Sequence, residues 1–251
     1  MSLYHRWQRA FDAEFPARPN SEPEKKVSAE QDTLRIIVGL LGIALPIVLW
    51  AGLAGVSGYT QPLESISHYF YTRVSSIFVI TMSLLAVVLI VYKGKRRRDF
   101  VLSLAAGLAA LSVVFFPTTN LSPKCCADDF QYVITYIDPK KIKATLHFVS
   151  AGIFLGSLAV MSIWRFPAKD SSDEHPNQRD RILYVVCGVV MLVAMLIIFL
   201  GSNNILFDKK DFEYPNAGTF WMESVAVWAF GYSWLLKAGF FSKVKNTLTK
   251  S

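Results

Sequence analysis

Three ionisable residues at the edges of hydrophobic stretches are the strongest candidates for chemistry in this sequence: His68, His147 and Glu223. Glu64, His68 and Thr72 follow one another at intervals of four residues, so a helix over this segment would present a carboxylate, an imidazole and a hydroxyl on one face. Ionisable groups at membrane depth are costly unless they face partners or water, and they therefore indicate a functional site. We predict that these groups line one pocket.

Polar and aromatic residues that neighbour Glu64 and His68 in the sequence complete the predicted pocket. The segment 65–72, Ser-Ile-Ser-His-Tyr-Phe-Tyr-Thr, is unusually polar for a membrane entry. Pro62 and Glu64 are typical of the first turn of a helix, which would continue into the membrane. The predicted pocket residues are Glu64, Ser67, His68, Tyr69, Tyr71, Arg73, His147 and Glu223.

Three interpretations of this cluster stay open. In the first, the polar side chains hydrogen-bond one another and tie helices together. In the second, His68, His147 and Glu223 are catalytic or metal-binding candidates, because two imidazoles and a carboxylate suit Zn and leave a coordination position for water. In the third, the pocket is a vestibule that binds a lipid head group or conducts a solute, with Arg73 and nearby lysines supplying positive charge.

The sequence does not establish whether the protein is an enzyme. An enzyme with these residues would catalyse hydrolysis or head-group transfer on a lipid-like substrate, with His68 or His147 as base or metal ligand. Glu223 would then be the carboxylate partner and Ser67 an orienting hydroxyl. Without catalysis, the protein would be a transporter or an accessory subunit of a membrane complex. The H-E-x-x-H, Walker A, dinucleotide-binding and G-x-S-x-G motifs do not occur.

Six hydrophobic stretches must position these residues, each roughly long enough to cross a bilayer. They cover residues 34–56, 72–92, 99–116, 143–164, 182–201 and 219–239. Hydrophobic residues make up 53% of the chain and charged residues only 18%, as in an integral membrane protein. Hydrocarbon offers no partners to backbone groups, so lipid-facing segments of this length must be helical. The predicted fold is an all-α polytopic membrane protein with six transmembrane helices.

Basic residues are distributed unevenly between the two sides of this predicted bundle. Of the 26 Lys and Arg residues, 19 lie in the N-terminal segment to Arg35, in the 93–98 and 165–181 loops, and from Lys237 onward. The positive-inside rule then places both ends in the cytoplasm (N-in/C-in). This distribution also accounts for the net charge of +7, so no nucleic-acid partner is indicated. We predict a multi-pass protein of the bacterial inner (plasma) membrane whose partners are membrane lipids.

The predicted bundle, residues 34–239, is flanked by two cytoplasmic segments. Residues 1–33 form a tail in which aromatic residues at helical spacing predict a short amphipathic helix on the membrane surface. These residues are Tyr4, Trp7, Phe11 and Phe15. The segment 28–31 has the form of a capping box, so we expect the first membrane helix to begin there. Residues 240–251 are expected to be a C-terminal tail.

Small residues indicate where the helices contact one another. Gly152 and Gly156 form a G-x-x-x-G motif in the fourth hydrophobic stretch, and the first stretch contains several glycines. These are Gly39, Gly42, Gly52 and Gly55. Glycines at this spacing predict close packing within the bundle, and the alternative for the G-x-x-x-G motif is a dimer interface.

The cysteines indicate a local feature of one outward loop. Cys125 and Cys126 are adjacent, whereas Cys187 lies in the inner half of the fifth stretch and is too distant to pair with them. In an oxidising periplasm the adjacent pair could form a vicinal disulfide, bond to another chain or remain as thiols. We expect a Cys125–Cys126 disulfide rather than a metal site with the neighbouring aspartates.

Short motifs in a fixed order carry a resemblance to a known family. They are S-I-S-H-Y-F-Y-T at 65–72, F-P-T at 116–118, H-F at 147–148, C-G at 187–188 and E-S at 223–224. Over about residues 34–239 the chain resembles a family of uncharacterised bacterial six-span integral membrane proteins, which implies the fold and compartment but no reaction.

A more distant similarity concerns the Ser, His and Glu residues alone. Their layout is similar to that of the alkaline ceramidase and adiponectin-receptor superfamily, whose members bind zinc in a membrane bundle through Ser, Asp and three His residues. By this resemblance a Zn cofactor would be expected. The sequence departs from that pattern, because it lacks the His-x-x-x-His pair and has six predicted spans instead of seven.

Overall fold

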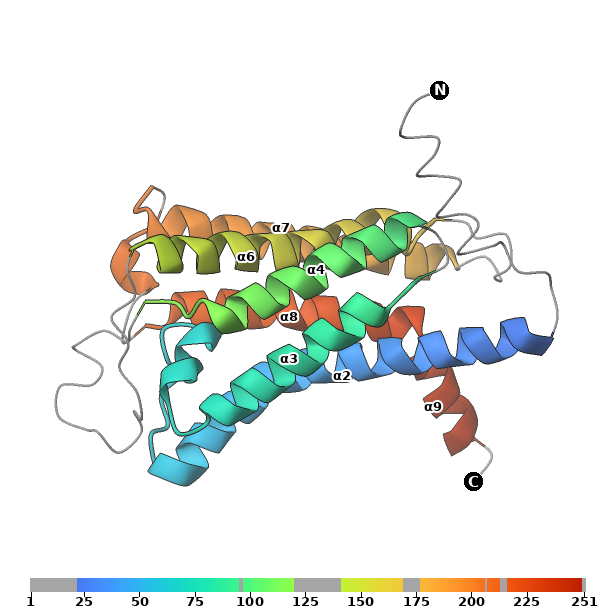
Figure 1. Ribbon diagram of the computed structural model, residues 1–251, viewed down its shortest axis with the longest axis horizontal. Coiled ribbons are helices and arrows are strands. Elements are labelled where there is room, and N and C mark those ends of the chain that lie inside the picture. Colours follow the sequence, from blue (N-terminus) through green and yellow to red (C-terminus); the bar gives the residue numbers. More distant parts are fainter. Residues whose placement is uncertain are drawn as a thin grey trace.

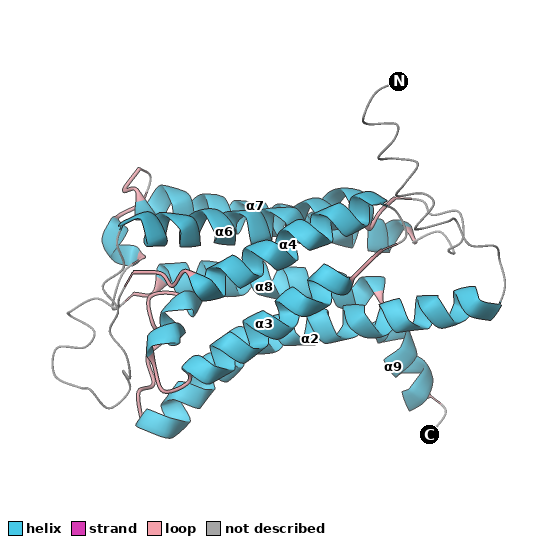
Figure 2. Ribbon diagram, in the orientation of Figure 1, coloured by secondary structure: helices cyan, strands magenta, loops and turns pink. Residues whose placement is uncertain are grey.

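The computed structural model describes residues 22–94, 97–119, 141–168, 177–205, 207–212 and 216–249. Within these ranges the protein is helical and contains no strand (Figure 2). The long helices are α2 (Glu22–Ser57), α3 (Ser75–Val91), α4 (Arg97–Phe115), α6 (Lys141–Val160), α7 (Gln178–Ser202) and α8 (Gly218–Lys237). The shorter elements are the 3-10 helices η1 (Ile66–Tyr71) and η3 (Lys209–Asp211), the π-helical turn η2 (Met161–Arg165) and α9 (Phe240–Leu248).

The six long helices form a ring in which each packs against its neighbours in the sequence (Figure 1). α2 contacts α3, α3 contacts α4, α4 contacts α6, α6 contacts α7, and α7 contacts α8. α8 then packs along α2 and closes the ring. Successive helices run in opposite directions, so η1 lies at one end of the ring and α9 at the other. We call these the η1 end and the α9 end.

Each predicted hydrophobic stretch coincides with one long helix, and the all-α class is confirmed for the described residues. Four segments are long and apolar enough to cross a membrane: Glu30–Ser57, Arg97–Phe115, Ala144–Arg165 and Gln178–Ser202. α3 is equally apolar but has only 17 residues. That is about 26 Å at ~1.5 Å per residue, close to a hydrocarbon thickness of ~30 Å. α8 contains Glu223 and several Ser, Tyr and Trp residues, but α2 and α7 enclose much of its surface.

The outer surface of the ring is apolar, as a lipid-facing surface must be. Large hydrophobic side chains are exposed along its helices, including Ile80 at 65% and Phe115 at 74%. Soluble monomers rarely expose contiguous apolar surface of this extent. Exposed tryptophans mark both ends, with Trp50 and Trp221 in ring contact at the η1 end and Trp164 at the α9 end. Tryptophan in these positions is typical of the two interfaces of a membrane protein.

Two glycines on facing helices allow α2 and α8 to approach closely. A Cβ added at Gly231 would lie 2.6 Å from the Gly39 carbonyl oxygen, and one at Gly39 would lie 2.9 Å from the Gly231 carbonyl oxygen. The predicted close packing at Gly39 of α2 is therefore confirmed. The G-x-x-x-G motif behaves differently, because a Cβ at Gly152 or Gly156 would meet no described atom within 4 Å. Among the described residues no helix therefore packs closely against these two glycines, and the prediction that the motif packs within the bundle is wrong.

The segments that flank the bundle also differ from expectation. α2 begins at Glu22, so Ser28 lies inside the helix and is not its N-cap. At the other end of the chain, residues 240–248 form the helix α9, where the sequence predicted only a tail. The predicted amphipathic helix of residues 4–15 lies outside the described residues.

Candidate functional site

The segment before α3 is not the continuous helix that the sequence predicted. Residues 66–71 form η1, Thr72 has an extended backbone with φ −110° and ψ 173°, and α3 begins only at Ser75. The Thr72 hydroxyl donates to the Tyr69 carbonyl oxygen at 2.8 Å and accepts from the Val74 N–H at 3.4 Å. Threonine bonded to nearby backbone in this way competes with helix formation. The predicted helical face with Thr72 at its end is therefore wrong.

Glu64 and His68 nevertheless lie side by side. Glu64 Oε2 and His68 Nε2 are 3.6 Å apart, and His68 Nδ1 is 2.7 Å from Ser65 Oγ, so the imidazole lies between a carboxylate and a hydroxyl. His68 is buried, at 6% exposure. The Glu64 carbonyl oxygen also accepts the Phe220 N–H at 2.9 Å, which links this segment to the start of α8.

The other two ionisable candidates, Glu223 and His147, bind the two residues that follow Ser65. The Ile66 N–H donates to Glu223 Oε2 of α8 at 2.6 Å. His147 Nε2 of α6 lies 3.0 Å from Ser67 Oγ. His68, Glu223 and His147 thus reach three consecutive residues, 65–67, and the structure brings these candidates together through the start of η1. η1 is a 3-10 helix, not an α-helix, and it is buried in protein, where membrane proteins tolerate irregular backbone.

The hydrogen bonds of His147 determine its tautomer. Its Nδ1 lies 2.8 Å from the Phe116 carbonyl oxygen, which can only accept, so Nδ1 carries the proton in neutral imidazole. Nε2 then presents a lone pair, and the Ser67 hydroxyl donates to it. Both residues are buried, at 3% for His147 and 9% for Ser67. The arrangement is a hydroxyl hydrogen-bonded to an imidazole whose other nitrogen is held by a third group, which is the geometry required of a serine nucleophile and its base.

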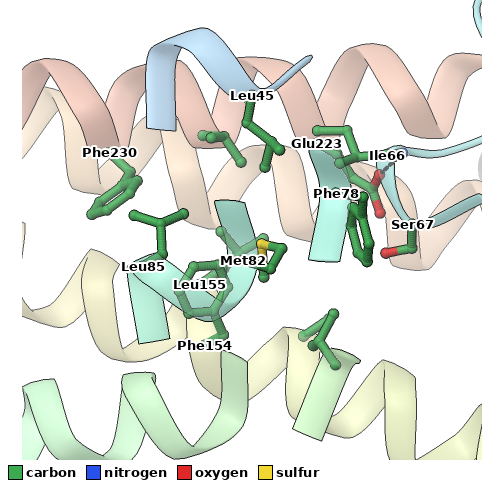
Figure 3. Close-up of a pocket in the computed structure, with 13 residues that line it drawn as sticks. Leu45, Ile66, Ser67, Phe78, Met82, Leu85, Phe154, Leu155, Glu223 and Phe230 are labelled. Atoms are coloured by element: carbon green, nitrogen blue, oxygen red, sulfur yellow. Dashed lines mark hydrogen bonds between the residues drawn. The ribbon is translucent and has the colours of Figure 1, made fainter. Parts of the chain in front are cut away.

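A cavity of about 50 Å³ lies inside the ring, directly beneath η1 (Figure 3). Its lining comes from η1 and from five long helices, α2, α3, α4, α6 and α8. Ser67 and Glu223 supply polar groups beside η1, and Figure 3 shows both at one side of the cavity. The remaining lining is apolar and includes Met82, Leu155 and Phe230. The cavity therefore has one polar end and an apolar body.

The other predicted pocket residues support the site from outside this cavity. Tyr69 is fully buried, packs against the Phe220 ring at 5.9 Å between centroids, and lies with its hydroxyl 3.5 Å from the Leu63 N–H. The Tyr71 hydroxyl donates to the Thr118 carbonyl oxygen at 2.5 Å, which ties η1 to the end of α4. Arg73 is exposed. Of the eight predicted pocket residues, Ser67 and Glu223 line the cavity.

The described residues do not assemble a metal site. No group of three His, Cys, Asp or Glu side chains among them could hold a metal ion. His147 already uses both ring nitrogens, one toward the Phe116 carbonyl and one toward the Ser67 hydroxyl. His68, His147 and Glu223 therefore do not fit the zinc site considered from the sequence, and we derive no step through a metal.

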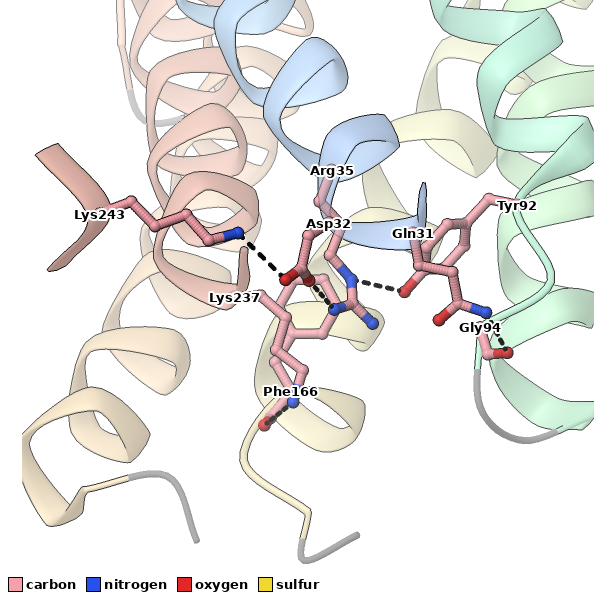
Figure 4. Close-up of polar contacts among 8 residues, drawn as sticks. All are labelled: Gln31, Asp32, Arg35, Tyr92, Gly94, Phe166, Lys237 and Lys243. Carbon is pink, nitrogen blue, oxygen red and sulfur yellow. Dashed lines mark hydrogen bonds and ion pairs between the residues drawn. The ribbon is translucent and has the colours of Figure 1, made fainter. Parts of the chain in front are cut away.

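A second polar cluster closes the α9 end of the ring, and the sequence analysis missed it (Figure 4). Arg35 is only 4% exposed, donates from Nη1 to Asp32 Oδ1 at 2.8 Å and from Nε to the Tyr92 hydroxyl at 3.0 Å. Asp32 also pairs with Lys243 of α9 at 3.2 Å. From the sequence, Arg35 and Lys243 indicate only the topology of the chain. The signal in the sequence is Arg35, the second residue of the hydrophobic stretch 34–56, where an unpaired charge would be costly.

An additional ion pair joins α4 to η2 at the same end. Arg165 Nε donates to Asp99 Oδ1, and both side chains are largely buried. The π-helical turn η2 ends at Arg165, and such turns inside helices often occur at specialised positions. Gly94 has a positive φ of 61°, and a Cβ there would clash with the Asp99 Cβ, so the Tyr-Lys-Gly turn requires glycine before this aspartate.

Comparison with protein-family models, with curated proteins and with solved structures gave no match. The two suspected resemblances stay proposals, and only the geometry of the site supports a function.

Cys125 and Cys126 lie outside the described residues, whereas Cys187 is a buried free cysteine in α7.

Proposed function

We propose that this chain is a multi-pass protein of the bacterial inner membrane whose six helices all span the bilayer, with both ends in the cytoplasm. Four sufficiently long apolar helices and an apolar outer surface support membrane insertion. The closed ring supports counting α3 and α8 as spans, because both run beside helices of full length. The basic residues of the α9 end, including Arg98, Arg179 and Arg181, support placing that end in the cytoplasm.

In this orientation the cavity beneath η1 binds one small amphiphilic, lipid-like ligand from the outer side. The observation that carries the proposal is the polarity of the lining, with Ser67 and Glu223 at one end and apolar side chains elsewhere. A ligand with a small polar head and an alkyl chain matches both parts. Ligand sites in helical bundles are commonly apolar with a few placed polar groups.

The size of the cavity limits the ligand. A water molecule needs roughly 10–15 Å³ of such volume, and an engineered cavity that binds benzene has about 150 Å³. At about 50 Å³ the cavity accepts a few waters or the first few atoms of a slim unbranched chain, so the rest of a long chain would have to extend beyond the cavity. An aromatic or bulky head group would require η1 to move. We therefore favour a single-chain amphiphile with a hydroxyl or amine head.

Photo-crosslinking in native membranes tests this proposal. The probe is a long-chain fatty alcohol with a diazirine in its chain and a terminal alkyne for detection. Ala151→Phe fills the cavity from α6, and Val149→Phe places the same side chain on the exposed face of that helix. We expect Ala151→Phe to abolish labelling that excess fatty alcohol competes away, and Val149→Phe to retain it. Equal labelling of both variants would contradict a ligand inside the ring.

A second function is supported by the Ser67–His147 hydrogen bond. We infer that this pair can hydrolyse an ester of such an amphiphile. Ser67 Oγ would attack the ester carbonyl carbon while its proton passes to His147 Nε2. The departing alcohol would take that proton, leaving an acyl group on Ser67. A water molecule, deprotonated by His147, would then release the carboxylic acid and restore the serine.

An alkyl fluorophosphonate, which bonds covalently to activated serines, tests the second function. Wild-type protein should be labelled at Ser67, and His147→Gln should lose this labelling because the serine is no longer activated. Ser65→Ala is the matched control, since Ser65 pairs with the other histidine, His68. Absence of labelling on folded wild-type protein, or unchanged labelling in Ser67→Ala, would exclude this hydrolase.

A further inference from the structure

The C-terminal helix α9 has a different character from the six helices of the ring. Four apolar residues, Phe240, Phe241, Val244 and Leu248, fall within an arc of roughly 100° when α9 is viewed along its axis. Three of them are exposed, with Phe241 at 42%, Val244 at 40% and Leu248 at 71%. An apolar stripe that stays exposed needs an apolar environment that the ring does not provide.

The charges of α9 are arranged around this stripe. At about 100° per residue, Lys243 and Lys245 lie on opposite sides of the apolar arc, and residues 240–249 contain no acidic residue. Lysines that flank an apolar face can extend along it and place their ammonium groups in a head-group layer. This pattern is typical of helices that lie in the plane of a membrane surface.

The position of α9 is suited to the same role. Gly239, with a positive φ of 64°, ends α8 and turns the chain, so α9 leaves the ring at a steep angle (Figure 1). Lys243 pairs with Asp32 of α2 at 3.2 Å, and the Phe241 ring contacts the Tyr232 ring of α8 at 5.2 Å between centroids (Figure 4 shows the lysine). Both contacts hold the first turn of α9 at the level where the ring ends and a head-group layer would begin.

We propose that α9 is an interfacial helix that binds the anionic phospholipids of the cytoplasmic leaflet. Phe241, Val244 and Leu248 enter the boundary between head groups and acyl chains, and Lys245 contacts lipid phosphates. The occupant of the exposed stripe is lipid because α9 follows directly from a ring whose outer surface is apolar and because its charge is only positive. The proposal rests on membrane insertion and is independent of any ligand in the cavity.

Fluorescence of the full chain in lipid nanodiscs tests this proposal. The three cysteines are first replaced, and an environment-sensitive dye is then attached to a single cysteine at position 244 or, as the matched control, 246. In nanodiscs that contain phosphatidylglycerol, the dye at 244 should show blue-shifted emission and quenching by brominated lipid. The dye at 246 should show neither. Equal exposure of both positions, or shielding at 244 without lipid quenching, would overturn the proposal.

The charge requirement is tested in the same system. Replacing phosphatidylglycerol with phosphatidylcholine, or introducing Lys245→Gln, should weaken the lipid occupancy of position 244. For the single lysine the expected loss is about fivefold, which corresponds to ~1 kcal/mol per basic residue at an anionic surface. Asn246→Gln is the control and should change nothing. If quenching at 244 is the same in both lipids, anionic recognition is excluded.

Discussion

Glu223 should hold η1 in place through one hydrogen bond, and truncating it to alanine should be costly. The Ile66 N–H donates to Glu223 Oε2 at 2.6 Å, and Ile66 is buried at 5% exposure. Glu223 Oε2 can accept this bond whether or not the carboxyl group is ionised, and a buried donor left unpaired costs about 1–3 kcal/mol. Glu223→Ala should therefore lower the free energy of unfolding by about 2–3 kcal/mol, or roughly 30- to 150-fold in the folding equilibrium.

Glu223→Gln separates the effect of the Ile66 hydrogen bond from the effect of the carboxyl group. Glu223→Gln keeps a carbonyl oxygen that can accept from Ile66, so it should cost less than about 1 kcal/mol. Arg73→Ala, at an exposed position just after η1, is the control and should lie within about 0.5 kcal/mol of wild type. Reversible unfolding by SDS in mixed micelles, followed by tryptophan fluorescence, measures all three variants. A neutral Glu223→Ala, or a Glu223→Gln as damaging as the alanine, would refute the reasoning.

Three further predictions concern packing, topology and the cysteine pair. Gly231→Ala should destabilise the protein by about 1–3 kcal/mol, because its Cβ would lie 2.6 Å from a backbone oxygen of α2. Gly152→Ala faces open space and should be neutral or gain up to ~1 kcal/mol in thermal unfolding. In a background without native cysteines, a membrane-impermeant maleimide added outside cells should label position 210 but not 98; the reverse would invert the topology. The Cys125–Cys126 pair should resist alkylation until reduced, and ready alkylation of periplasm-exposed protein would exclude the disulfide.

Hydropathy could predict the ring helices because their length and apolar character follow from the bilayer itself. Even α8, the least apolar of them, has bounds within two residues of the predicted 219–239. The sequence also singled out His147 and Glu223, because buried ionisable side chains at membrane depth need partners. Both side chains reach the start of η1, one at Ser67 and one at Ile66.

Other features could not be predicted because they depend on contacts between distant residues. The break after η1 arises where the Thr72 hydroxyl bonds to local backbone, whereas helix signals before it favoured a continuous helix. The role of Ser67 was underestimated, since only the approach of α6 makes it the partner of His147. In the Asp32–Arg35–Tyr92 cluster, Arg35 and Tyr92 are 57 residues apart in sequence, a separation that no periodic pattern records.

The most direct test of a ligand cavity within the ring is a high-resolution cryo-EM map of the protein in lipid nanodiscs, saturated with the fatty-alcohol probe. Our account predicts elongated density inside the ring, with its polar end beside Ser67 and Glu223 and its chain between α3 and α6. It also predicts Ser67 in contact with His147. Probe density only on the outer surface of the ring, or a closed lumen with η1 detached from His147 and Glu223, would contradict the account.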